Sequence, residues 1–158
     1  MEKLFRAYLQ LLTSLREQLE HLTDLTRLKA KAAQNDDLLA LDEVLRQEQA
    51  AALNFRGLEQ RRQKQTAELG IADLALSELP VCCPESLRTE AQKAVDELTA
   101  QYRTYRSVAE DTRAILEHNL QEVEQTLAQA GVPPDAGGPG YMPPVSETPP
   151  NMKTDFRA

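Results

Sequence analysis

Residues that could carry chemistry are few and scattered in this chain of 158 residues. The two histidines, His21 and His118, each follow a glutamate, and glutamate with histidine is the ligand set of helical di-iron bundles. Those bundles place Glu and His three positions apart on two helices, whereas Gln18 stands at that position before His21. Adjacent helical residues point about 100° apart, so neither Glu-His pair shares a face. We expect no metal and no cofactor.

The remaining candidates form no catalytic pattern. Cys82 and Cys83 are adjacent, two ligands do not close a tetrahedral zinc site, and a strained vicinal disulfide is the rarer alternative. The serines lack the strand and turn of a nucleophile elbow. The run at 137–140, Gly-Gly-Pro-Gly, follows no predicted strand and precedes no predicted helix, so it is not a phosphate loop. We expect that the protein is not an enzyme.

Composition narrows the class of partner. The formal charge of −7 lacks the basic excess with which nucleic-acid binders neutralise phosphates. No stretch approaches the ~20 consecutive apolar residues that insert into and span a bilayer, and Met1-Glu2-Lys3 opens a charged periodic pattern that is not typical of a signal peptide. We therefore expect a cytoplasmic protein that does not bind nucleic acid and does not insert into a membrane.

Prolines and glycines divide the chain into two parts. Most of both kinds follow residue 130, and such a segment builds neither a helix interior nor a packed core. The sequence predicts one helical domain at residues 1–130, with a break near 70–84, and a flexible Pro/Gly-rich tail at 131–158. The predicted fold is all-α, a long antiparallel helical hairpin plus a longer third helix in a coiled-coil-like three-helix bundle, with a disordered C-terminal tail.

Leucines at alternating spacings of four and three predict a first helix to about residue 33. The cluster Asn35-Asp36-Asp37 predicts a break and an N-cap for a second helix, which ends at Gly70 as a left-handed C-cap. Gly57 inside the second helix is explained by the close approach of a neighbour or by chance. A basic cluster predicts a solvated face paired with Glu59 and Glu68. Its members are Arg56, Arg61, Arg62 and Lys64.

Apolar residues between the second and third helices predict a short helical plug across the end of the bundle. They are Ile71, Leu74, Leu76, Leu79 and Val81. Pro84 fits the first position of a third helix, predicted at about 85–130. Its seam repeats at spacings of four and three for more than three heptads and consists of Leu98, Tyr102, Tyr105, Ala109, Thr112, Leu116, Asn119 and Val123.

Helix lengths predict an unequal bundle. At 1.5 Å per residue the first helix spans on the order of 48 Å and the third on the order of 69 Å, so the third passes the hairpin tip by about 20 Å, roughly residues 117–130. Leu116, Leu120, Val123 and Leu127 form one apolar face there, with Ile115 beside them. Three explanations stay open. The third helix bends, the face is buried in a homodimer, or it binds a helix of another protein.

Three stretches of the helical region resemble the FlgN family of flagellar type III export chaperones. The stretch at 35–41, Asn-Asp-Asp-Leu-Leu-Ala-Leu, is similar to the family's acidic turn and leucine pair. The charged run from Gln47 through 58–62 to 67–70, Ala-Glu-Leu-Gly, resembles its second helix. The stretch at 112–120 resembles its late helix, with Thr112 and Asn119 departing from the family's pattern.

The resemblance implies a cytoplasmic chaperone for the C-terminal helical segments of hook-associated proteins, which form the hook–filament junction. It implies that the protein prevents their premature assembly and delivers them to components of the export apparatus. In that role the late third helix holds the client, with apolar residues sheltering its apolar stripe and Glu117 and Asn119 setting register. The expected client-binding residues are Ile115, Leu116, Glu117, Asn119, Leu120, Val123 and Leu127. The alternative is a structural coiled-coil protein that self-associates through its third helix.

Overall fold

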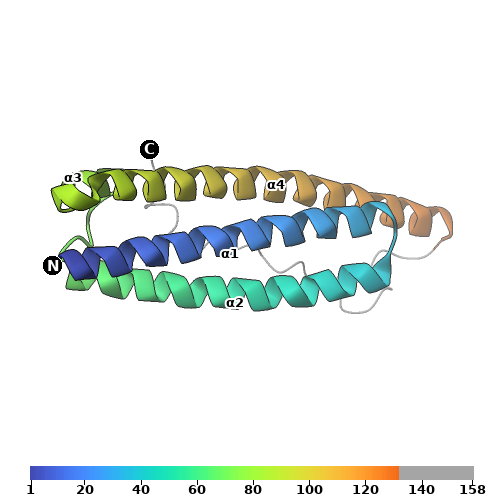
Figure 1. Ribbon diagram of the computed structural model, residues 1–158. Helices are drawn as coiled ribbons and strands as arrows, with labels where there is room; N and C mark the ends of the chain where they lie inside the picture. The colour runs from blue at the N-terminus through green and yellow to red at the C-terminus, as the bar shows by residue number, and fades with distance from the viewer. Residues whose placement is uncertain (132–158) are drawn as a thin grey trace.

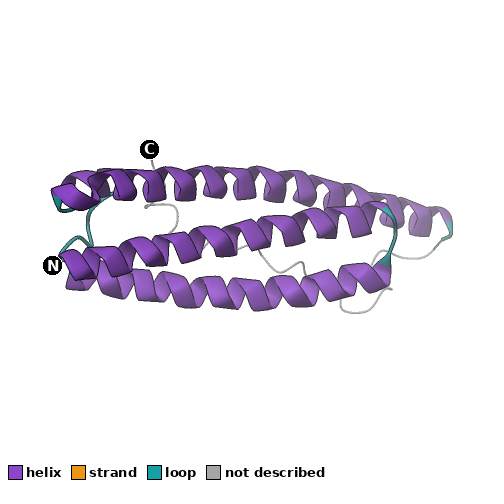
Figure 2. Ribbon diagram, in the orientation of Figure 1, coloured by secondary structure: helices purple, strands orange, loops and turns teal. Residues whose placement is uncertain are grey.

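A computed structural model describes residues 1–131, which are helical almost throughout and include no strand (Figures 1 and 2). Three long helices carry the architecture, and a short helix flanked by two 3-10 turns connects the second long helix to the third. Their bounds are α1 Glu2–Gln34, α2 Leu38–Glu68, the turn Leu76–Glu78, α3 Leu79–Cys82, the turn Glu85–Leu87, and α4 Arg88–Gln129. The all-α prediction is confirmed, and the predicted tail lies outside the described residues.

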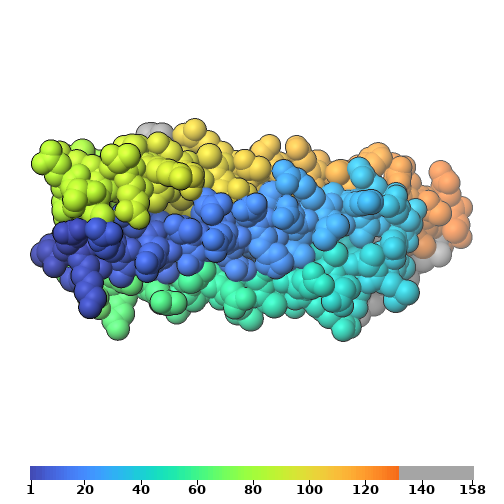
Figure 3. Space-filling model, in the orientation of Figure 1, coloured from blue at the N-terminus to red at the C-terminus, as the bar shows by residue number. Residues whose placement is uncertain are grey.

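The long helix α1 lies between α2 and α4 and packs along both of them (Figure 1). In contrast, α2 and α4 approach each other closely in few places. α1 and α2 form the predicted antiparallel hairpin, and α4 runs along the other side of α1. The space-filling view shows the elongated body that results (Figure 3). Because α1 is covered on two sides, it needs the widest apolar face, and its leucines supply that face.

The hairpin turn is closed by backbone geometry at two aspartates. Asp36 adopts a left-handed φ of 52°, and its N–H donates to Ala33 O at 3.3 Å while that of Asp37 donates to Ala32 O at 3.0 Å. The Asp37 carboxylate then accepts a hydrogen bond from the N–H of Ala40 at 3.1 Å and caps α2. The predicted break and N-cap are confirmed.

The other end of α2 closes in the same way. Gly70 has a φ of 72°, and its N–H donates to Ala67 O at 3.1 Å while that of Ile71 donates to Thr66 O at 2.9 Å. These bonds satisfy the last carbonyls of the helix in a Schellman motif, as the left-handed glycine predicted. No neighbour comes within 4 Å of a Cβ built on Gly57, so close helix approach does not explain that residue.

The predicted plug forms with one error. Leu76 and Leu79 are buried against the bundle, but Val81 is 76% exposed. Four-residue α3 turns Val81 outward because only one side of so short a helix can face the core. Pro84 precedes a 3-10 turn, so α4 begins at Arg88 and not directly after the proline.

The apolar core is concentrated at the end of the bundle that holds α3, which we call the leucine end. Its most completely buried side chains are Tyr8, Leu12, Leu15, Leu19, Leu79, Leu87 and Leu98. Toward the hairpin turn, which we call the tip end, buried inner positions of α1 and α4 carry Thr26, Ala32, Ala33 and Thr112. Leu38, which continues the α2 leucine pattern, is 77% exposed there. The core is therefore thick at one end and thin at the other.

Candidate functional site

Helix α4 extends past the hairpin turn (Figure 1). It has 42 residues against 33 in α1, and its last tie to α1 is the Asn119 side-chain amide, which donates to Ala33 O at 3.0 Å. The remaining residues, 120–129, form what we call the overhang, which is about 15 Å long at 1.5 Å per residue. The predicted overshoot is thus present but shorter, because residues 117–119 still lie beside the end of α1. α4 continues beyond them as an unbroken helix.

The predicted apolar site residues divide at the tip of the bundle. Ile115 and Leu116 are half-buried against the bundle. Leu120, Val123 and Leu127 are 58%, 55% and 39% exposed, and every overhang residue is exposed. The overhang therefore carries an apolar face with no partner among the described residues.

The predicted polar site residues are engaged within the protein. Glu117 is exposed, and its Oε1 lies 3.0 Å from Nε of Arg113. Asn119 is half-buried and uses its amide to close the end of the α1–α4 interface. The role of both residues in setting the register of a client stays a prediction.

Polar contacts between α1 and α4 fix where the overhang begins. The Gln101 amide donates to Thr23 Oγ1 at 3.2 Å, and the Thr112 hydroxyl lies 3.5 Å from Thr26 O. Together with the Asn119 bond, these contacts are spaced along the thin part of the core. The small alanine and threonine side chains there would allow α4 to slide along α1, so the hydrogen bonds fix its position. The sequence pattern placed Thr112 and Asn119 in the seam but gave no sign of their backbone partners.

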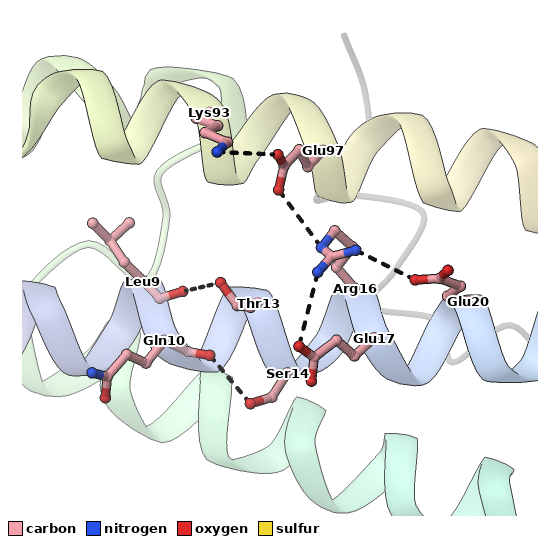
Figure 4. Close-up of polar contacts among 9 residues, drawn as sticks. All are labelled: Leu9, Gln10, Thr13, Ser14, Arg16, Glu17, Glu20, Lys93 and Glu97. Atoms are coloured by element: carbon pink, nitrogen blue, oxygen red, sulfur yellow. Dashed lines mark hydrogen bonds and ion pairs between the residues drawn. The ribbon is translucent and has the colours of Figure 1, made fainter.

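An ion-pair cluster ties α1 to α4 at the leucine end (Figure 4). Arg16 lies 3.9 Å from Glu17 and 3.4 Å from Glu20 on its own helix, and 3.6 Å from Glu97 on α4. Lys93 approaches Glu97 at 3.9 Å. The glutamates are about half exposed, so we expect each pair to add well under about 1 kcal/mol to stability and mainly to orient the helices.

A buried charged pair lies within α2. Arg56, Arg61 and Lys64 of the basic cluster are exposed, as predicted, but Arg62 is buried together with Glu59. Glu59 is 6% and Arg62 9% exposed, and Arg62 Nε donates to both carboxylate oxygens at 3.0 and 2.9 Å. Burial alone would lower the pKa of Arg62, but the Glu59 carboxylate and the Tyr8 hydroxyl outweigh it and raise that pKa. Glu59 and Arg62 lie at seam positions of the heptad pattern, which is the sequence signal for their burial.

A charged contact joins α1 and α2 nearer the tip end. Lys29 Nζ lies 2.9 Å from the Glu48 carboxylate, and both side chains are mostly buried. Burial raises the pKa of Tyr105 on α4, and the nearby Glu48 carboxylate raises it further. The Glu48 carboxylate of α2 therefore lies near the Tyr105 side chain of α4.

No other feature of residues 1–131 forms a convincing site. No group of three His, Cys, Asp or Glu within that range could hold a metal ion. Cys82 is exposed and Cys83 buried, the two form no disulfide, and burial raises the pKa of the Cys83 thiol. An open groove between α3 and α4, lined by Pro80 and Val81 with charged residues of α4, has no convergent catalytic groups. None of the described helices combines the length and the apolar character needed to cross a membrane.

Comparison with known proteins gives one finding. The family model described as FlgN protein matches residues 1–143, which include every helix described above. The search of curated proteins and the search of solved structures find no match. The match covers most of the chain. The chain therefore belongs to the FlgN family of flagellar export chaperones.

Proposed function

We propose that this protein is a cytoplasmic chaperone for the hook-associated proteins of the hook–filament junction. It binds their C-terminal helical segments, prevents premature assembly, and delivers them to components of the type III export apparatus. Membership of the FlgN family supports the chaperone class. The observation that carries the binding mechanism is the overhang with its unpartnered apolar face.

The overhang suits a helical client because its exposed residues repeat at helical spacing. Leu120, Val123 and Leu127 follow one another on one face, as the anchors of a helix-pairing surface do. Ile115 and Leu116 extend this face into the bundle. A client helix laid along the face would cover the apolar side chains of both partners. Ordering a flexible client segment costs free energy, so the complex is specific and still releasable.

The double substitution Leu120→Asp with Val123→Asp tests this mechanism. Both side chains are more than half exposed and lie beyond the last tie to α1, so we expect an unchanged helical content and unfolding midpoint. We expect the parent protein, but not the variant, to retain hook-associated proteins in a pull-down. Unfolding of the variant would show that the face belongs to the core and would contradict the mechanism.

A matched control separates location from chemistry. Leu53→Asp with Val81→Asp makes the same two changes at residues that are 66% and 76% exposed on other parts of the bundle. We expect this control to keep both stability and client binding. Equal loss of binding in the control would mean that added negative charge, and not the overhang, explains the result.

Self-association through α4 is the competing explanation for the same face. Light scattering of the parent over a range of concentrations distinguishes the two, since the chaperone mechanism leaves the overhang unpartnered until a client is present. A stable dimer that the Leu120→Asp, Val123→Asp variant converts to a monomer would favour self-association.

A further inference from the structure

The overhang and the hairpin turn border one surface at the tip end. We call this surface, formed by residues 32–41 and 114–131, the seat. Asn119 points at α1, and Val123 lies four residues later on the same side of α4, so the apolar face continues the side of α4 that α1 occupies. The hairpin turn lies beside the start of the overhang, where Asn119 reaches Ala33 O (Figure 1). A helix laid on the overhang therefore abuts the turn, where Asp36, Asp37 and Leu38 are exposed.

The charge of this seat has one sign. Residues 32–41 and 114–131 contain no Lys or Arg. Their carboxylates are Asp36, Asp37, Glu117, Glu122 and Glu124. Glu117 pairs with Arg113, and Glu122 lies 3.2 Å from His118. Within residues 1–131, no Lys or Arg lies within ion-pair distance of Asp36, Asp37, Glu122 or Glu124. The apolar face is therefore bordered by four carboxylates that no Lys or Arg of residues 1–131 neutralises.

We propose that the seat selects an amphipathic helix whose apolar stripe is flanked by lysine or arginine. This inference rests on the proposed function and adds the chemistry of the client and a second contact surface, the hairpin turn. The client's apolar stripe covers Leu120, Val123 and Leu127, while its cations approach Asp36, Asp37, Glu122 and Glu124. Complementary charge speeds encounter and rejects helices with acidic flanks.

Charge also disfavours two other occupants of the seat, a second copy of the protein and the chain's own residues 132–158. A second copy would bring the same acidic border against itself, and the whole chain carries a formal charge of −7. The chain's own residues 132–158 contain Lys153 and Arg157 against three carboxylates, so they supply no net positive charge. A basic amphipathic helix from another protein is the occupant that the seat complements.

Two synthetic peptides with one leucine stripe and either Lys or Glu on both flanks test the proposal by fluorescence anisotropy with the full chain. We expect the Lys peptide to bind about tenfold tighter than the Glu peptide at low salt, with the difference shrinking as salt rises. Equal affinity for the two peptides, or binding of neither, would overturn the inference.

Matched variants assign the preference to the seat. The variant D36N/D37N/E122Q/E124Q removes the charge but keeps an Asn at the left-handed position and at the N-cap, so we expect it to fold and to lose the preference. A control, E68Q/D73N/E85Q/E90Q, neutralises four exposed carboxylates at the leucine end and should keep it. Persistence of the preference in the first variant would contradict the proposed seat.

The variant L120D/V123D separates this inference from the proposed function. If it loses both peptides while the parent binds them equally, the apolar surface stands and charge selection fails. If it binds both as tightly as the parent, the overhang is not the binding surface and both proposals fail. A parent that is dimeric by light scattering, with a monomeric L120D/V123D variant, would assign the seat to a second copy.

Discussion

At the leucine end, inner positions of α1, α3 and α4 carry leucine, valine and tyrosine, whereas the same positions near the hairpin turn carry threonine, alanine and asparagine. Apolar burial contributes about 25 cal/mol per Å², so most of the folding free energy arises at the leucine end. The tip end is held in register by single hydrogen bonds such as that of Asn119. The difference teaches that folding depends mainly on the leucine end, so the overhang can expose leucines without a role in the core. In the proposed function, the client binds at the opposite end from this core.

The largest expected effect on stability comes from truncating a leucine to alanine, and we compare this substitution at the two ends of the bundle. Leu12 has no exposed surface, so Leu12→Ala should lower the free energy of unfolding by about 3 kcal/mol. Leu116 is half-buried near the tip, and Leu116→Ala should cost about 1 kcal/mol. Urea unfolding measures both values. Equal losses would show that the core is uniform along the bundle.

The next effect concerns Glu59 and Arg62, the buried charged pair within α2. Arg62→Met leaves the Glu59 carboxylate buried without its partner. This change should lower the free energy of unfolding by about 3 kcal/mol, which does not exceed the loss expected for Leu12→Ala. The double variant Glu59→Leu, Arg62→Met removes both charges and should recover most of that stability. Chemical denaturation of the parent and of both variants tests this. A double variant as unstable as the single one would mean that the pair itself is required.

A smaller effect is expected at the tip. Asn119→Ala removes the bond to Ala33 O and should cost about 1 kcal/mol. The exposed neighbour Gln121 provides the control, since Gln121→Ala removes no tie to α1 and should change stability by less than about 0.5 kcal/mol. Thermal unfolding compares the two variants. An Asn119→Ala variant as stable as the Gln121→Ala control would show that the last tie of α4 contributes nothing.

Periodic and capping features of the sequence predicted most of the fold. The leucine spacing predicted α1, the aspartates at 36 and 37 predicted the hairpin turn, and the left-handed Gly70 predicted the end of α2. Each of these signals is local, because caps and seams depend on residues a few positions apart. The overhang followed from comparing helix lengths, which is also a property of the sequence alone.

Long-range contacts explain what the sequence did not predict. The exposure of Val81 depends on the direction in which a short helix enters the bundle, and the burial of Arg62 depends on Tyr8, which is more than fifty positions away. The hydrogen bond of Asn119 to Ala33 O joins a side chain to a backbone oxygen. Every residue has a backbone oxygen, so the sequence does not indicate which one a side chain will bind. Within the predicted site, Ile115, Leu116 and Asn119 are half-buried because they lie beside α1, whereas the residues beyond the end of α1 are exposed.

Hydrogen exchange of the full chain, alone and with a hook-associated protein, tests the central claim that the overhang is unpartnered until a client covers it. We predict that amides of 120–129 exchange much faster than those of 95–105 in the free chain and slow markedly in the complex, while 95–105 stay unchanged. Protection of 120–129 in the free chain equal to that of 95–105, or slowing on client addition confined to other helices, would contradict the account.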